Sequence, residues 1–551
     1  MKTIIIGGVA AGTSAAAKLR RTSETEDIVI YESGQYISYS TCGMPYLIGR
    51  EDVNLQNLTP RDPQWFLERY NINIKINHEV LEITPDNKSI QVKDLQTSQI
   101  FTDYYDTLIL ATGSKASLPP IEGLALSHVF TIKNMDDTIK LQKYLSNHNI
   151  ENALIMGAGF IGIEILDNLL QKGIRTSVIE AGKQLMPPLD DDMSIWLEDY
   201  LTKKGISYHL DSKVTRIDKN KVTLSNNRIL PADLVVIAVG ITPEVSLANA
   251  IGIKLGKTGA ILVDDNMNTS HKSIKAIGDC TEIWSSIDHQ ALYRPMGSTA
   301  NKMGRISTGL LYAQYPLNFR GVLGTGIMQF KELTIGFTGY SEKLARDFGY
   351  DVEIIHNIKE NQSKYLPESR EMIIKGVADR KTGRLLGAQL IGERGVDKRL
   401  DVFATAISFK AKVEDLFHLD LSYAPPYSTT KDPVHYTGMI LANAIYDYRK
   451  IITPSTLIGH EEEYLIIDVR SPKDYEKGHI SQAINIPLAK LRSQLTSLNP
   501  KKEIITHCNK GVTGNAAQNI LINNGFDKVY NLSGGYKNYS LYSKYRSNRN
   551  D

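Results

Sequence analysis

Two cysteines stand where thiol chemistry is plausible, and the first is Cys42. It lies in the stretch Ser38 to Tyr46, shortly after a glycine-rich turn and an acidic residue that ends a strand pattern. A helix N-terminus at this position would favour a thiolate through the helix dipole and backbone N–H groups. A buried cysteine that only packs fits the same nine residues equally well.

The second is Cys508, which follows a strand pattern over residues 503–507 and opens a glycine-containing loop. The N–H groups of such a loop, before a helix expected near Asn515, form an anion cradle that lowers the thiol pKa. Cys280, the third cysteine, is assigned to packing. The three are far apart, which argues against a disulfide framework and a structural zinc site. Cys42 therefore has no neighbouring cysteine as a redox partner.

The elements that must position Cys42 begin at the N-terminus. Residues 3–6 predict a buried parallel strand that runs into the turn Gly7 to Gly12 and an Ala-rich helix. A second strand ends at Glu32, 20 positions after Gly12. This βαβ pattern is typical of a dinucleotide site: a tight turn at Gly7, close helix packing at Gly12 and a ribose contact at Glu32. Val9 replaces the usual middle glycine of the pattern.

The pattern repeats with a full fingerprint at 157–162, so two dinucleotides are expected. Its acid is Glu180, 18 residues after Gly162. Glu180 would accept a ribose 2′-hydroxyl and repel a 2′-phosphate, which favours NADH over NADPH. Arg175 and Lys183 nearby leave NADPH open.

Three further buried strand patterns end in glycine turns, at residues 112–113, at Gly240 and at Gly278. Asp279 follows the last of them. An aspartate there is suited to a ribityl hydroxyl or a phosphate, and a plain turn aspartate is the alternative.

Bulk properties exclude several classes of protein. The chain has 551 residues, 42% of them hydrophobic, and a net charge of +2, which gives no sign of a nucleic-acid or anionic-membrane partner. No run of about 18 apolar residues predicts a membrane span. The N-terminus enters a strand pattern directly, without a signal peptide, so we expect a cytoplasmic protein.

Residues 1 to about 446 resemble the flavin-dependent pyridine nucleotide-disulfide reductases. The branch indicated uses a single redox cysteine and includes coenzyme A-disulfide reductase, NADH oxidase and NADH peroxidase. The motifs are GGVAAG at 7–12, the Cys42 stretch, ATG at 111–113, GAGFIG at 157–162, AIGD at 276–279 and YAPPYSTTKDP at 423–433. From about 455 the chain resembles a rhodanese domain, through IDVR at 467–470, GHI at 478–480 and the Cys508 loop. The whole chain resembles the fused coenzyme A-disulfide reductase/rhodanese type.

The resemblance implies an α/β fold with two Rossmann-like dinucleotide-binding domains, an α+β dimerisation domain and a C-terminal α/β rhodanese domain. The expected ranges are 1–115 and 244–324 for the FAD domain, 116–243 for the NAD(P)H domain, 325–446 for dimerisation, 455–540 for rhodanese and 541–551 for a polar, basic tail.

The resemblance also implies the cofactors, namely FAD on the first fingerprint and Asp279, and NADH or NADPH on the second. Lys431 matches a position beside the flavin. The expected cofactor-binding residues are Gly7, Gly8, Ala11, Gly12, Glu32, Ser33, Thr112, Gly113, Gly157, Gly159, Phe160, Ile161, Gly162, Glu164, Glu180, Gly240, Gly278, Asp279 and Lys431.

Cys42 becomes the redox centre in this resemblance, and Tyr365 and Tyr423 match tyrosines that reach the cysteine of the partner subunit in a homodimer. The expected coenzyme A contacts are Lys18, Arg21, Ser38 and Thr41. Two positions depart from the pattern: Thr41 stands where Asn often precedes the cysteine, and Thr513 where rhodanese loops often have Arg.

The function expected is NAD(P)H-dependent reduction of coenzyme A disulfide or of coenzyme A persulfide or polysulfide at Cys42. Cys508 would carry sulfane sulfur. One alternative is an NADH oxidase or peroxidase in which Cys42 cycles through sulfenic acid. Another is a sulfur carrier or redox sensor whose function lies in the rhodanese domain.

Overall fold

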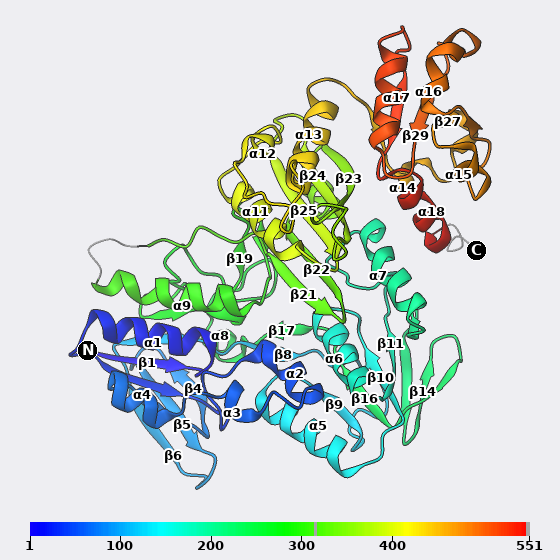
Figure 1. The fold of residues 1–551 in the computed structure, drawn as a ribbon. Coiled ribbons are helices and arrows are strands. Elements are labelled where there is room, and N and C mark those ends of the chain that lie inside the picture. Colours follow the sequence, from blue (N-terminus) through cyan, green and yellow to red (C-terminus); the bar gives the residue numbers. More distant parts are fainter. Residues whose placement is uncertain (313–316, 547–551) are drawn as a thin grey trace. The chain divides into compact units, whose positions relative to one another are not determined.

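The computed structural model describes residues 1–312 and 317–546, which form two units (Figure 1). The first unit contains Met1–Lys183 and Ser207–Val322, and the second contains Gln184–Ile206 and the chain from Leu323 onward. Both combine helices with sheets, so the predicted α/β class is confirmed. Among the helices described, none has the length and apolar character needed to cross a bilayer.

The first unit contains two parallel sheets of the dinucleotide-binding kind. One has the order β18 (Ile274–Ala276), β7 (Thr107–Leu110), β1 (Lys2–Ile6), β2 (Asp27–Tyr31) and β3 (Asn73–Lys75). The other has the order β12 (Tyr208–His209), β11 (Arg175–Ile179), β10 (Asn152–Met156), β16 (Leu234–Ile237) and β9 (Val129–Thr131). The central strands are buried and apolar, as expected for parallel strands covered on both faces.

Helices cover these sheets, and glycines allow the closest approaches. Helix α1 (Ala10–Thr22) lies along α9 (Gly297–Tyr312), and a Cβ at Gly304 would come within 2.4 Å of the Ala11 carbonyl oxygen (Figure 1). The other helices of this unit are α2 (Met44–Gly49), α3 (Leu55–Leu58), α4 (Pro63–Tyr70), α5 (Met135–Asn147), α6 (Phe160–Gln171) and α8 (Ser246–Ala250).

Smaller sheets complete the first unit. Two are antiparallel and three-stranded: β4 (His78–Thr84), β5 (Ser89–Asp94) and β6 (Ile100–Tyr104), then β13 (Val214–Asp218), β14 (Lys221–Leu224) and β15 (Ile229–Pro231). The two-stranded sheets pair β8 (Ser114–Ala116) with β17 (Ile241–Pro243), and β19 (Ile283–Trp284) with β20 (Ala291–Leu292).

The second unit begins with a five-stranded antiparallel sheet. Its order is β21 (Gly326–Phe330), β22 (Leu333–Gly339), β25 (Leu385–Gly392), β24 (Glu371–Asp379) and β23 (Val352–Glu360), so β23 is an edge strand. Its helices are α10 (Glu342–Asp347), α11 (Val396–Ser408), α12 (Asp415–His418) and α13 (Pro433–Ile445).

A parallel sheet follows in the same unit. Its order is β26 (Ile451–Ile452), β30 (Val529–Leu532), β29 (Ile504–His507), β27 (Leu465–Asp468) and β28 (Ile484–Asn485). Two clusters of buried apolar residues, around Ile467 and around Ile466, cover its two faces. The helices are α14 (Pro454–Leu457), α15 (Pro472–Glu476), α16 (Leu488–Leu491), α17 (Val512–Ile522) and α18 (Gly535–Arg546).

Two segments make contacts that the sequence does not indicate. The range predicted for the NAD(P)H domain includes α7 (Asp191–Lys203), yet this helix belongs to the second unit. Helix α18 also extends through residues predicted to be a tail, because Arg546 bonds Glu198 of α7 at 2.9 Å and is buried there. Neither pairing leaves a signal in the local sequence. Residues 547–551 lie outside the described residues.

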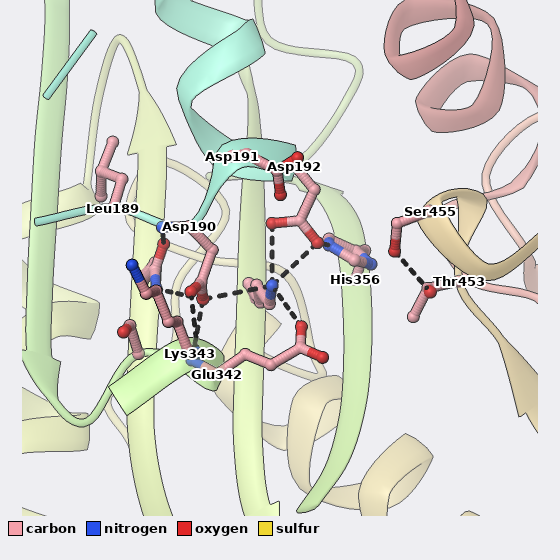
Figure 2. Close-up of polar contacts among 12 residues, drawn as sticks. Leu189, Asp190, Asp191, Asp192, Glu342, Lys343, His356, Thr453 and Ser455 are labelled. Atoms are coloured by element: carbon pink, nitrogen blue, oxygen red, sulfur yellow. Dashed lines mark hydrogen bonds and ion pairs between the residues drawn. The ribbon is translucent and has the colours of Figure 1, made fainter. Parts of the chain in front are cut away.

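A buried ion cluster joins α7 to the antiparallel sheet (Figure 2). The Lys375 ammonium lies 2.8 Å from a carboxylate oxygen of Asp192, 2.8 Å from Glu342 and 3.1 Å from Asp190. His356 Nε2 bonds Asp192 Oδ2 at 2.9 Å, and its Nδ1 bonds the Ser533 hydroxyl at 3.0 Å. The cluster thus connects α7, β24, β23 and the turn after β30.

Candidate functional site

A cavity of about 760 Å³ lies where the first parallel sheet meets its turns. Eight of the predicted cofactor residues line it: Gly7, Ala11, Glu32, Ser33, Thr112, Gly113, Gly278 and Asp279. Gly7 has φ +109°, and a Cβ there would lie 2.2 Å from the Ala111 carbonyl oxygen, so only glycine fits the turn. Gly12 lies beneath it, since a Cβ would lie 1.9 Å from the Gly7 oxygen.

Glu32 closes this turn from the next strand. Its carboxylate accepts N–H bonds from Gly8 at 2.7 Å and Gly34 at 2.8 Å. Glu180 repeats the geometry in the second fingerprint, accepting from Ala158 at 2.8 Å and Gly182 at 2.7 Å. Both acids therefore lie beside a fingerprint turn, where a ribose could bind.

Asp279 lies in a short 3₁₀ turn (Gly278–Cys280) on the cavity wall. Its carboxylate accepts a bond from the Ser114 hydroxyl at 3.2 Å and lies 3.8 Å from the Lys133 ammonium. Burial lowers the pKa of Lys133, partly opposed by Asp279. The sequence analysis did not identify Lys133, because only the fold brings residues 114, 133 and 279 together.

The second fingerprint opens α6. Gly157 has φ +102°, and Gly162 packs against it as Gly12 packs against Gly7. Phe160 and Ile161 form the first turn of the helix, and Gly240, at φ +121°, follows β16. Burial raises the pKa of Glu164, one turn into α6, to about 7. Gly159 is the residue before the helix and has open space around it.

Cys42 lies in a 3₁₀ turn (Thr41–Gly43) that leads into the short helix α2, and its side chain is exposed. Ser38, three residues before the first residue of this turn, has a left-handed backbone conformation with φ +47°. Helix α2 packs directly on α6, since a Cβ at Gly49 would come within 2.5 Å of Asn168. Thr41 and Tyr39 line the larger cavity.

A second cavity, of about 550 Å³, opens on the same segment. Arg21, Ser38, Tyr39 and Ser40 line it; Lys18, on the same helix as Arg21, is not among its lining residues. Basic and aromatic side chains form the rest of the wall, namely Arg61, Trp65, Phe66, Tyr70 and Arg305. Arg61 lies 5.1 Å from the Trp65 ring and Arg21 lies 5.9 Å from the Tyr70 ring.

These five residues were not predicted from the sequence. The sequence signal is the mixture of arginines and aromatic residues between 61 and 70, a combination suited to phosphate and to a stacked base. Residues 301 and 305 come from α9 and could be found only from the fold.

Tyr365 and Tyr423 lie in the second unit, and both are exposed, at 75% and 49%. Their segments run side by side, because the Ser363 N–H bonds the Pro425 carbonyl at 3.1 Å. Lys431, also exposed, precedes Asp432, which caps α13 and pairs with the buried Arg399 at 2.8 Å.

Cys508 stands at the end of β29 with only 6% of its surface exposed. The Gly511 N–H donates to its sulfur at 3.2 Å, and helix α17 starts at Val512. The first turn of α18 also contacts the loop, with the Tyr536 N–H bonded to the Cys508 carbonyl at 2.8 Å. Burial lowers the pKa of the adjacent His507 to about 4, so this imidazole is neutral at pH 7. The loop therefore offers N–H groups to an anion on sulfur.

Three family models match the chain. The pyridine nucleotide-disulphide oxidoreductase model matches residues 1–300, its dimerisation-domain model 327–433 and the rhodanese-like domain model 455–541. The solved structure of reduced CoADR-RHD from Bacillus anthracis is 34% identical, covers 99% of this chain and 98% of its own, and has a TM-score of 0.96.

Two other relatives are similar. An NAD-dependent persulfide reductase from A. fulgidus is 32% identical, with 98% of this chain and 100% of its own covered and a TM-score of 0.90. A coenzyme A disulfide reductase from Staphylococcus aureus is 29% identical over 439 residues, which cover 79% of this chain and 99% of the relative.

Proposed function

The chain belongs to the pyridine nucleotide-disulphide oxidoreductases, and from this we propose that it is an NAD(P)H-dependent flavoprotein that reduces coenzyme A disulfide or persulfide at Cys42. The observation that carries the proposal is the position of residues 38–42. Tyr39 lines both cavities, Thr41 the larger one and Ser40 the smaller one. Cys42 therefore follows a segment shared by a dinucleotide-sized cavity and a basic, aromatic one.

The larger cavity fits FAD. The turn at Gly7 leaves no room for a side chain, Glu32 lies at the ribose position, and Asp279 adds a polar group beside Lys133. The second fingerprint fits NAD(P)H, with Glu180 favouring NADH. Bound together, these cofactors would supply a pair of electrons to sulfur.

The smaller cavity suits coenzyme A. Its arginines would pair with phosphates, and Trp65 or Tyr70 would stack on the adenine ring. Arg21 and Ser38 are the expected contacts that line this cavity. The proposed site also contains Lys18, from the family pattern, and Thr41, which directly precedes Cys42 and lines the larger cavity.

Cys42 would act as a thiolate nucleophile. The thiolate attacks one sulfur of coenzyme A disulfide, the S–S bond breaks, a mixed disulfide forms on Cys42, and a coenzyme A thiolate leaves. Two electrons then cleave the mixed disulfide to the Cys42 thiolate and a second coenzyme A. We propose that Tyr365 and Tyr423 of a second copy of the chain hydrogen-bond the departing thiolate, which requires a homodimer.

Cys508 would hold sulfane sulfur as a persulfide, stabilised by the Gly511 N–H and its neighbours. Sulfur transferred from Cys508 and released reductively at Cys42 would leave as sulfide. The presence of this second sulfur site favours a disulfide or persulfide acceptor over oxygen.

The test is to follow NADH and NADPH oxidation without oxygen in the presence of coenzyme A disulfide, coenzyme A persulfide or no acceptor, and then in air. We expect acceptor-dependent oxidation, faster with NADH, that Cys42→Ser abolishes and Cys508→Ser preserves for the disulfide. Rapid oxidation in air with no acceptor-dependent rate would instead support the oxidase alternative.

A further inference from the structure

The loop that follows Cys508 has one charged side chain, and the antiparallel sheet neutralises it. Among residues 509–513 only Lys510 is charged. Its ammonium lies 3.0 Å from Glu360 Oε1 and also bonds Glu371. Burial works against the charge on Lys510, but the two carboxylates raise its pKa. The cation that the loop carries is therefore shared by two anions.

Glu360 and Glu371 form an acid pair in the antiparallel sheet. Glu360 ends β23, Glu371 begins β24, and the two are direct partners in the antiparallel register. Like charges directly opposite each other destabilise a sheet. Two lysines of the rhodanese-like domain offset this repulsion, because Lys537 binds Glu371 as Lys510 does. With all four groups ionised, the cluster has no net charge.

The acid pair lies on the face of the sheet that contacts the domain of Cys508. Side chains alternate along a strand, so Glu360 shares a face of β23 with His356. His356 Nδ1 bonds the Ser533 hydroxyl, in the turn after β30, at 3.0 Å. Lys359 lies on the opposite face, where its ammonium is over an aromatic ring of α13. The acid pair is therefore the charged feature that this sheet presents to the Cys508 loop.

Backbone contacts tie the charge cluster to the loop itself. The Lys537 N–H donates to the Asn509 carbonyl at 3.0 Å. The preceding N–H, of Tyr536, donates to the Cys508 carbonyl at 2.8 Å. Because Lys537 binds Glu371 through its side chain and the loop through its backbone, the acid pair stays beside the loop.

We propose that Glu360 and Glu371, which lie outside the rhodanese-like domain, are specificity-determining residues that disfavour dianionic sulfur donors at Cys508. The favoured donor is an organic persulfide, which brings at most one negative charge. The inference rests on the proposed role of Cys508 as a carrier of sulfane sulfur. It also agrees with Thr513, which adds no cation at the position where rhodanese loops often have Arg.

Charge separates the two kinds of donor. With thiosulfate, the Cys508 thiolate attacks the outer sulfur, the S–S bond breaks, a Cys508 persulfide anion forms, and sulfite leaves with the electron pair. One negative charge then meets two. With a protonated organic persulfide, the thiolate attacks the outer sulfur, the proton stays on that sulfur, and an organic thiolate leaves with the electron pair. One negative charge then meets none.

The neutralised lysine therefore affects the two reactions differently. A free Lys510 would reduce the repulsion between the thiolate and thiosulfate, and a partly buried site is only weakly screened by salt. The acid pair removes that help. Transfer from a neutral persulfide involves no such repulsion and is almost unaffected.

The test measures charge selectivity at Cys508 directly. Full-length holoenzyme is alkylated with anionic iodoacetate and with neutral iodoacetamide, and the rate at Cys508 is followed by peptide mass mapping. We expect Glu360→Gln to raise the iodoacetate/iodoacetamide rate ratio on the order of threefold, and Glu360→Asp to leave it unchanged. The control is Asp351→Asn, which removes an ion-paired carboxylate next to the opposite end of β23 and should leave the ratio unchanged.

Lys510→Gln supplies the opposite change. It leaves the acid pair without the cation of the loop, so the alkylation ratio should fall below the wild-type value. An unchanged ratio in Glu360→Gln would overturn the inference. Should that variant not fold, an unchanged ratio in Lys510→Gln would overturn it instead.

Sulfur loading of Cys508 is the second measurement. Thiosulfate or ethyl persulfide is added, and the gain of one sulfur atom on Cys508 is followed by mass. Glu360→Gln should lower the thiosulfate concentration needed for half-loading about threefold, with that of the persulfide unchanged. An equal change for both donors would contradict a role of charge. If wild-type Cys508 accepts sulfur from neither donor although the alkylation ratio rises in Glu360→Gln, the role of the acid pair stands and the proposed carrier function fails.

Discussion

Burial of the Glu164 carboxyl changes its pKa and therefore makes the stability of the protein depend on pH. Its pKa of about 7 lies well above the unfolded value of about 4.3, because burial disfavours the charged form. The neighbouring Tyr46, three residues after the Cys42 turn, also has a raised pKa, caused first by burial and then by Glu164. Protonation of Glu164 is thus linked to the helix that follows Cys42.

We predict that Glu164→Gln stabilises the protein at alkaline pH. Between about pH 4.3 and 7 the unfolded carboxyl ionises while the folded one stays protonated, so folding loses free energy as pH rises. Removing the charge should therefore gain roughly 1–3 kcal/mol at pH 8.5 and almost nothing near pH 4. Thermal unfolding of holoenzyme at both pH values measures this. The exposed Glu51→Gln serves as the control, and an equal gain at both pH values would contradict the account.

Some residues of the candidate site could be predicted from the sequence and others could not. Gly7, Gly12 and Glu32 were predictable because strand, turn and helix are local, and their spacing determines their contacts. Lys133 and Arg305 were not, because each reaches its cavity from an element far away in the sequence.

At the scale of elements, α7 makes contacts that the sequence does not indicate. Its position within residues 116–243 suggested a part of the NAD(P)H domain, yet its Asp192 pairs with Lys375 of β24 and its Glu198 with Arg546 of α18. The local sequence of α7 does not say which partner buries its charged face. The partners are given by ion pairs with residues far away in the sequence.

We predict that Lys375→Met strongly destabilises this group of elements. The lysine is 1% exposed, and without it the carboxylates of Asp190, Asp192 and Glu342 would be left together in a buried site. Breaking such a cluster typically costs about 3–5 kcal/mol. Thermal unfolding should show a clear loss of stability for Lys375→Met and almost none for Lys343→Met, whose side chain is exposed. Equal stability of the two variants would show that the cluster contributes little.

The cluster also determines a response to acid. Burial alone would raise the pKa of Asp192, but Lys375 and His356 hold it well below its usual range. A depressed folded pKa means that the stabilisation is present above the unfolded value of about 3.9 and is lost as pH falls below it. The connection through His356 to Ser533 would weaken under the same conditions.

At the scale of the whole molecule, the chain combines a pyridine nucleotide-disulphide oxidoreductase with a rhodanese-like domain. The order of domains was predictable from the motifs, because each fingerprint and each cysteine loop is contiguous in sequence. The placement of α7 and the helical end of α18 were not, because both depend on contacts between distant segments. The same kind of contact joins Lys510 of the Cys508 loop to Glu360 at the end of β23.

The central claim is that Cys42, without a neighbouring cysteine, forms its disulfide with coenzyme A. The most direct measurement is anaerobic incubation of the holoenzyme with coenzyme A disulfide, quenching in acid, and peptide mass mapping of Cys42, Cys280 and Cys508. The account predicts an adduct of coenzyme A mass on Cys42, approaching one per chain, that NADH removes. An unmodified Cys42 in enzyme that still oxidises NADH with coenzyme A disulfide would contradict it.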